Sequence, residues 1–214
     1  MMTRLISALF VLGALVGVSP VWAQDGKAAE DAVAVVRGTS EKMIETLKAE
    51  RENIQKDPAR VRTLVEEIVV PHFDSIAMSQ LVLGKHWRRA TKDEKIAFIR
   101  QFRTLLIHTY SSALSEFKDE VINYKEPKIS SDGERVTVRT EVVRSSGPEI
   151  PIDYLMRFRK DQWKVNDVLI DGISLITNYR ASFSEKIRKV GLDGLIGELE
   201  QRNADTGTRA GGSA

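Results

Sequence analysis

The sequence from Trp163 to Phe183 constrains the fold most, because it predicts a β-strand that runs directly into an amphipathic helix. Apolar and polar residues alternate along the first part, as they do in a strand that buries one face. The apolar parity switches near Asn166, which predicts a β-bulge. Gly172 permits a tight exit, and Ser174 is a candidate N-cap. The predicted helix then carries an apolar stripe at three- and four-residue spacing: Ile176, Tyr179, Phe183, Ile187 and Val190.

Period-two patterning also precedes this stretch. Including residues 163–170, it predicts four strands, the others at 121–129, 136–142 and 150–158. Asp132-Gly133 is a turn signal between the first two. Consecutive strands joined by short turns form an antiparallel meander with one apolar face. Of Tyr154 and Met156 in the third strand, we expect at most one to face the helices.

Helical patterning dominates the first half of the chain. Helices are predicted at 28–54, 61–69, 73–83 and 92–117, the last opened by a capping box of Thr91 and Glu94. The apolar positions of the last helix are broader than one stripe, so we expect it to be covered on more than one side. The predicted fold is therefore α+β: an antiparallel four-stranded meander covered by helices.

The two ends differ in character from the middle. Residues 1–23 resemble a cleaved signal peptide, with Arg4, an apolar run over 5–18, and a small-residue cleavage site ending at Ala23. A retained membrane anchor is the alternative, but the apolar run is shorter than the ~20 residues a spanning helix needs. We expect one domain over 24–203 and a disordered tail over 204–214, which is small and polar.

Composition excludes several classes of function. The chain has 32 basic and 30 acidic residues, which lacks the basic excess of a nucleic-acid-binding protein. It has no cysteine, and His72, His86 and His108 lie in different segments without metal-ligand spacing. We expect no catalytic site, no metal site and no cofactor.

Three ordered blocks carry a family resemblance. WKVNDVLIDGISLITNYRASF at 163–183 resembles the signature of the MlaC family, also called the toluene-tolerance auxiliary family, of periplasmic phospholipid-binding proteins. FDSIAMSQLVLGKHWRRAT at 73–91, followed by FIRQFRTLLIHTYSSAL at 98–114, agrees with it. GLDGLIGEL at 191–199 lies where that family ends.

The resemblance implies a function that periodicity alone leaves open. From the pattern, the apolar face forms either an ordinary core or a pocket; the resemblance implies that sheet and helices enclose an apolar pocket. It implies a periplasmic carrier that shuttles phospholipid between outer and inner membrane and maintains outer-membrane lipid asymmetry. The implied partners are an outer-membrane lipoprotein complex and an inner-membrane ATP-driven lipid transporter with a lipid-binding ring. We expect a monomer whose bound phospholipid is cargo.

Two sets of residues are candidates for the site. The first comprises apolar and aromatic side chains expected to hold the acyl chains: Phe73, Met78, Leu81, Trp87, Phe102, Leu106, Tyr110, Val138, Tyr154, Met156, Trp163, Val165, Ile173 and Tyr179. The second comprises cations that serve partner docking or the lipid headgroup, or are simply solvated: Lys85, Arg88, Arg89 and Arg180.

Two other functions remain open at this point. A small enzyme could use a cone-shaped α+β scaffold, with a cavity carboxylate such as Asp167 as its base. A structural envelope adaptor would need neither pocket nor cargo. A co-purified lipid would argue against both.

Overall fold

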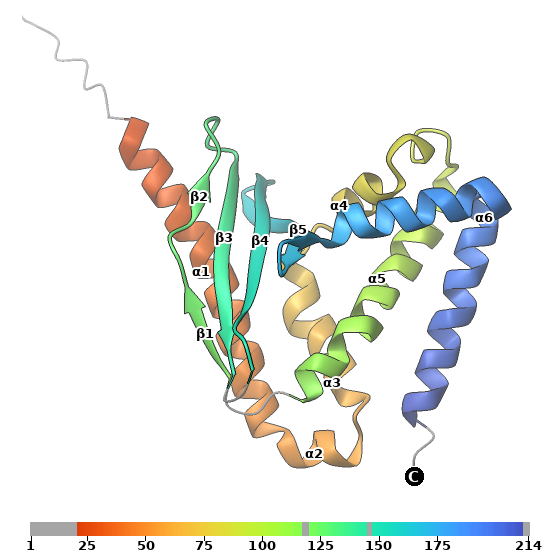
Figure 1. The fold of residues 1–214 in the computed structure, drawn as a ribbon, viewed down its shortest axis with the longest axis horizontal. Coiled ribbons are helices and arrows are strands. Elements are labelled where there is room, and N and C mark those ends of the chain that lie inside the picture. The colour runs from red at the N-terminus through yellow and green to blue at the C-terminus, as the bar shows by residue number, and fades with distance from the viewer. Residues whose placement is uncertain (1–20, 117–119, 145–146, 212–214) are drawn as a thin grey trace, which may run out of the picture.

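The computed structural model describes residues 21–116, 120–144 and 147–211 (Figure 1). In Figure 1, a sheet with α1 along it forms one half of the molecule, and α4, α5 and α6 form the other. The α-helices are α1 (Val21–Ala49), α2 (Arg51–Lys56), α3 (Arg60–Leu64), α4 (Ser75–Leu83), α5 (Lys92–Ser115) and α6 (Leu175–Gly211). The strands are β1 (Val121–Tyr124), β2 (Lys128–Ile129), β3 (Arg135–Val143), β4 (Ile150–Arg159), β5 (Gln162–Ile170) and β6 (Ile173–Ser174).

The sheet is an antiparallel meander, as predicted, but it has more strands than the sequence indicated. The order is β1-β3-β4-β5-β6, and β2 also pairs with β3. The single strand predicted over 121–129 is divided into β1 and β2, with Pro127 between them, a residue that cannot donate to a strand ladder. β6 is a two-residue addition on the edge of β5.

The predicted bulge lies in β5. Leu155 of β4 pairs with Asp167, and the next residue, Met156, pairs with Val165, so Asn166 is the extra residue. Tyr154 and Met156 both pack in the apolar cluster on one face of the sheet. The expectation that at most one of them faces inward is therefore wrong, because residues two apart on a strand share a face.

The helix ends follow local sequence signals in some places and not in others. The Thr91–Glu94 capping box is present, with both reciprocal hydrogen bonds formed. The helix predicted over 61–69 is instead α3 followed by a π turn, η1 (Val65–Val69), and a 3₁₀ turn, η2 (Val70–His72). The 3₁₀ turn contains Pro71, whose missing N–H ends regular helical bonding.

The C-terminal helix is longer than predicted. α6 bends at Gly191, whose φ of 76° is not helical, and then continues to Gly211. Residues 204–211, predicted as part of a disordered tail, are helical, and side-chain bonds from Gln201 to Asp205 and from Thr206 to the Arg202 carbonyl support that turn. Residues 212–214 lie outside the described residues.

The predicted signal peptide lies almost wholly outside the described residues, which begin with the first turn of α1. None of the helices in the described ranges combines the length and the apolar content that crossing a bilayer requires.

The apolar interior is divided into separate clusters. The helical cluster joins α4, α5 and α6 around Phe98, Phe102 and Phe183. The sheet cluster joins α1 to the inner faces of β3, β4 and β5 around Val138 and Met156. α5 contributes side chains to both, and also to a third cluster with α2 and α3, which confirms that it is covered on more than one side.

Candidate functional site

The two main clusters meet through a few aromatic side chains, which we call the seam: Phe73, Tyr110 and Tyr179. Phe73 and Tyr179 are half-buried and pack against both the helical and the sheet cluster. Tyr110 reaches from α5 to the sheet cluster. The seam is thus where the two clusters contact each other, through Phe73 and Tyr179, which pack against both, and through Tyr110.

Two tyrosines, Tyr110 of the seam and Tyr154 of the sheet cluster, are poorly solvated. Burial raises the pKa of Tyr110 to about 12, and the neighbouring Tyr179 hydroxyl adds to the effect. Burial also raises the pKa of Tyr154, on the inner face of β4, to about 12. Burial is the main cause of both shifts, so each phenol lies in a less polar environment than water.

The helical cluster is interlocked by aromatic rings. Phe98 stacks on Phe102 with centroids 5.6 Å apart, and Phe183 meets both rings edge-on at 5.9 Å. Tyr179 meets Phe102 edge-on at 5.3 Å and so extends this network to the seam. Each such ring pair adds about 0.5–1.5 kcal/mol beyond area burial.

The structure distributes the predicted lipid-binding residues over three environments. Phe73, Tyr110 and Tyr179 form the seam, and Tyr154 packs against the sheet cluster. Others belong to the two clusters: Met78, Trp87, Phe102, Leu106, Val138, Met156, Trp163 and Val165. Leu81 and Ile173 are 37% and 63% exposed and belong to neither cluster, so their packing offers no support for a role in holding acyl chains.

Asp167 is the candidate base of the alternative enzyme, but its side chain forms hydrogen bonds that organise the local backbone. Its side chain is buried and accepts hydrogen bonds from the backbone N–H groups of Val168, at 2.8 Å, and Ile176, at 3.1 Å, and from the Ser174 hydroxyl at 2.6 Å. Ser174 in turn accepts from the N–H of Thr177, which confirms it as the N-cap of α6. Asp167 therefore ties the bulge of β5 to the start of α6.

One hollow, of about 480 Å³, gathers positive charge, and we call it the cationic hollow. α4, η3 (Gly84–His86), the β4–β5 hairpin and α6 all contribute to it. Its six cations are Lys85, Arg88, Arg157, Arg159, Lys164 and Arg180, and Asp74 is its single carboxylate. Three of the four cations proposed from the sequence thus converge, whereas Arg89 is exposed and does not line the hollow.

Sequence reasoning missed the three cations of the hairpin, although a signal for them exists. Arg157 and Arg159 are two apart on β4, and Lys164 of β5 lies directly opposite Arg157. Strand alternation and the two-residue turn at Lys160-Asp161 place all three on one face.

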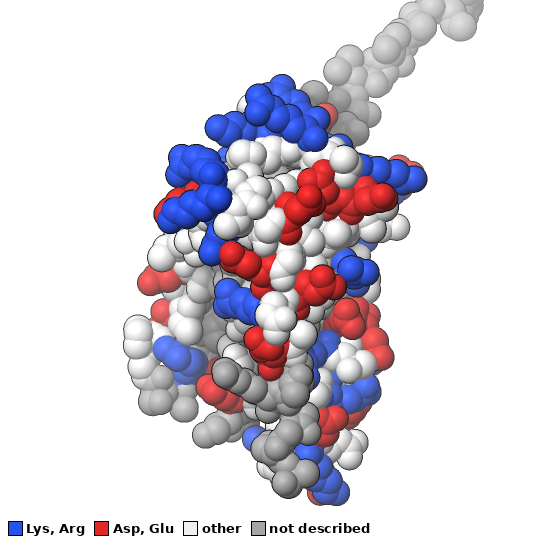
Figure 2. All heavy atoms as spheres, turned by 90° about the vertical axis from the view of Figure 1, so that its right-hand side faces the viewer, with Lys and Arg blue, Asp and Glu red and all other residues white. Residues whose placement is uncertain are grey.

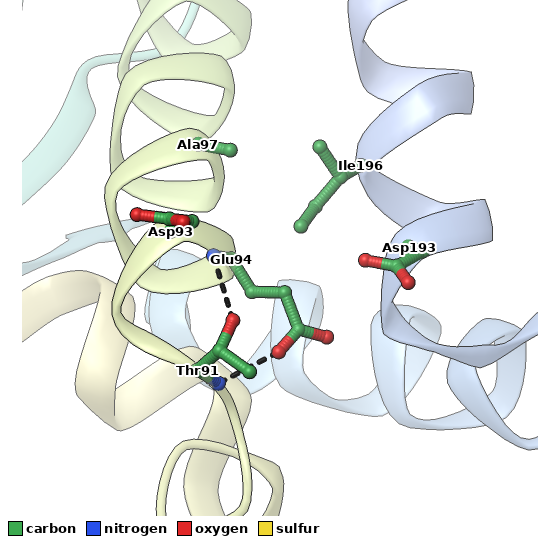
Figure 3. Close-up of a pocket in the computed structure, with 6 residues that line it drawn as sticks. All are labelled: Thr91, Asp93, Glu94, Ala97, Asp193 and Ile196. Carbon is green, nitrogen blue, oxygen red and sulfur yellow. Dashed lines mark hydrogen bonds between the residues drawn. The ribbon is translucent and has the colours of Figure 1, made fainter.

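A second hollow, of about 450 Å³, lies between α5 and α6 and is acidic (Figure 3). Its carboxylates are those of Asp93, Glu94 and Asp193. Hydrogen bonds from the Thr91 backbone and side chain hold the pKa of Glu94 below its usual value, because Glu94 belongs to the capping box. Within the described ranges, no three carboxylate or imidazole side chains are grouped so that they could hold a metal ion.

Both hollows are open to solvent and lined largely by polar and charged side chains; neither is the enclosed apolar pocket predicted from the sequence. Figure 2 shows the α6 side of the molecule, where cationic side chains gather at the upper end and carboxylates lie across the middle.

Comparison with known proteins gives consistent matches. The model of the family described as "MlaC protein" matches residues 37–201. "Toluene tolerance protein ttg2D" of Pseudomonas putida is 27% identical over 172 residues, covering 77% of this chain and 80% of that protein. "Intermembrane phospholipid transport system binding protein MlaC" of Haemophilus influenzae is 23% identical over 171 residues, covering 78% of this chain and 79% of that protein.

A solved structure agrees with these matches. The phospholipid-binding protein from Ralstonia solanacearum, solved in complex with a phospholipid, superposes with a TM-score of 0.76 at 30% sequence identity. The match covers 83% of this chain and 99% of that one. The fold described above is therefore one that holds a phospholipid in a similar protein.

Proposed function

This chain belongs to the MlaC protein family, and from that membership we propose that it is a phospholipid carrier. The observation that carries the proposal is the match, over nearly the whole length of the other chain, to a structure that contains a phospholipid. The Haemophilus influenzae relative is named for intermembrane phospholipid transport, which supports the same class of function.

The acyl chains of the lipid enter at the seam. Phe73 and Tyr179 pack against both apolar clusters and Tyr110 against the sheet cluster, so parting these side chains exposes apolar surface on both sides. Each methylene sheltered from water gains about 0.8 kcal/mol. An acyl chain in a bilayer is already sheltered from water in this way. The carrier must therefore enclose the whole tail in order to take the lipid from the membrane. The two described hollows are open and polar and do not enclose an acyl tail, so the seam must widen to make room for it.

The carrier works in the periplasm, after cleavage of residues 1–23 so that the chain begins at Gln24. There it moves lipid between the outer and inner membranes and maintains the lipid asymmetry of the outer membrane. Its partners are an outer-membrane lipoprotein complex and an inner-membrane ATP-driven transporter with a lipid-binding ring. It acts as a monomer, with the phospholipid as its cargo.

The protein performs no chemical reaction on that cargo. Asp167 is the candidate base of the enzyme alternative, and both its oxygens are occupied by hydrogen bonds that organise β5 and α6. A general base must lie within hydrogen-bonding distance of the proton that it removes. The oxygens of Asp167 instead accept hydrogen bonds from the protein itself.

Lipid content of the purified protein tests the proposal. Organic extraction and native mass spectrometry should find about one phospholipid per chain, and delipidation should lower the melting temperature, since a ligand that binds only the folded state stabilises it. Protein that purifies without lipid, and whose melting temperature stays unchanged when lipid is added, would contradict the carrier function and favour the envelope adaptor.

A further inference from the structure

Only three of the six cations of the cationic hollow form an ion pair or a hydrogen bond within the described residues. Arg157 pairs with Glu134 at 3.1 Å, Arg180 donates to the Leu81 carbonyl at 2.6 Å, and Lys164 donates to the Pro71 carbonyl. The other three cations, Lys85, Arg88 and Arg159, form no ion pair or hydrogen bond with the residues that the structure describes. The whole chain carries a formal net charge of only +2, so this concentration is local.

Two of these positive charges lie directly opposite each other on neighbouring strands. Arg157 and Lys164 are direct cross-strand partners, and like charges directly opposite each other destabilise a strand pair. Lys85, Arg89 and Arg188 all act to lower the pKa of His86, after burial as the main cause, which reflects the positive field on this side of the molecule. An anion in the hollow would offset this repulsion.

The single carboxylate of the hollow, that of Asp74, offsets only one of its six positive charges. The Asp74 side chain accepts a hydrogen bond from the backbone N–H of Ala77 at 2.9 Å, as the N-cap of α4. The presence of Asp74 is therefore explained by its position at the start of α4. The six partners that a bound anion could use are arginine and lysine side chains, of which Arg88 and Arg159 are examples with spare donors.

The hollow adjoins the seam along two segments of the chain. Asp74 lines the hollow and directly follows Phe73 of the seam, while Arg180 lines the hollow and directly follows Tyr179. Consecutive Cα atoms are about 3.8 Å apart. Two residues that line the hollow are therefore each one position along the chain from a residue of the seam.

We propose that the cationic hollow binds the phosphate group of the carried phospholipid. Arginine side chains recognise phosphate through paired N–H donors, and Arg88 and Arg159 are free to do so. This inference rests on the proposed carrier function. It adds a source of selectivity, since lipids with a phosphate are retained over neutral lipids with the same tails, and anionic headgroups over zwitterionic ones.

The test compares two soluble lipids that differ only in the headgroup. Delipidated protein is titrated calorimetrically with dihexanoyl phosphatidylglycerol, with dihexanoylglycerol, which lacks the phosphate, and with inorganic phosphate. The hollow variant is Arg88→Gln combined with Arg159→Gln. The control is Arg51→Gln combined with Arg100→Gln, which removes the same charge from two exposed arginines outside the hollow.

The hollow variant should bind phosphatidylglycerol on the order of tenfold more weakly than wild type, because charge-assisted contacts to phosphate are lost. Its affinity for dihexanoylglycerol should be unchanged, and the control should match wild type for both lipids. The phosphatidylglycerol affinity of wild type should also fall with added salt.

Four outcomes would overturn the inference. If the hollow variant bound phosphatidylglycerol as tightly as wild type, the hollow would not contact the headgroup. If that variant also failed to transfer lipid to a membrane partner, the hollow would be a protein-docking surface. Equal weakening for both lipids would mean that the variant acts through the apolar site. Arg88- and Arg159-dependent binding of inorganic phosphate alone would assign the hollow to free phosphate. If wild type bound neither lipid, the carrier function itself would fail.

Discussion

The helical cluster and the seam are both aromatic, yet they are built differently. In the helical cluster, Phe98, Phe102 and Phe183 contact one another through three ring pairs, and each is buried. At the seam, Phe73 and Tyr179 are half-buried and each belongs to the edge of two clusters. The helical cluster is thus stabilised by ring contacts among buried side chains, whereas the seam joins two clusters through side chains that are more exposed.

The largest expected effect is at the centre of the helical cluster. Phe98→Ala should lower the free energy of unfolding by about 3–5 kcal/mol, because the cavity it leaves is surrounded by rings that cannot collapse into it. Urea unfolding of the delipidated protein measures this. A loss below about 1 kcal/mol would mean that the cluster is loosely packed, and the contrast with the seam would disappear.

A smaller effect is expected next to the seam. Leu106 is partly buried and packs against the rim of the helical cluster. Leu106→Ala should lower the stability of the lipid-free protein by less than about 2 kcal/mol and reduce the lipid carried, because a rim residue has fewer neighbours to lose. Denaturant unfolding and lipid content are measured on the same preparations. A large loss of stability with normal lipid content would make Leu106 a core residue.

An effect confined to alkaline pH is expected from the phenols of Tyr110 and Tyr154. Burial raises the pKa of both Tyr110 and Tyr154 to about 12, above the ordinary value of 10. The folded state therefore holds protons that the unfolded state releases, and stability should be complete below pH 10 and fall as the pH rises towards 12.

Tyr154→Phe should make this alkaline loss shallower, because one of the two titrating groups is removed. Unfolding free energies measured from pH 9 to pH 11.5 give the slope for wild type and variant. Identical slopes would show that the Tyr154 phenol is as well solvated as in the unfolded chain.

Much of the fold follows from local sequence rules. The bulge at Asn166, the N-cap at Ser174 and the capping box at Thr91 each depend on residues within a few positions of one another, and all three are present. The antiparallel meander follows from period-two patterning and short turns. Such features could be predicted because the physical cause lies within the segment itself.

The candidate site was harder to predict, because it depends on which segments meet. Periodicity marks both Val138 and Tyr179 as apolar, but only the packing distinguishes a cluster interior from a seam. Ile173 shares the apolar pattern and is nevertheless exposed, since it lies on an edge strand of two residues. The hairpin cations could have been found by pairing Arg157 with Lys164, but their meeting with Arg180 is a tertiary contact that no local pattern encodes.

We expect the acyl chains to insert at the seam and to leave the two clusters intact. A photoreactive benzoylphenylalanine at position 179, in place of Tyr179, tests this claim most directly, with the same group in place of the exposed Ile96 of α5 as control. After irradiation of the lipid-loaded protein, mass spectrometry should find a covalent phospholipid adduct at position 179 and none at position 96. Absence of an adduct at position 179, or equal labelling at both positions, would contradict the claim.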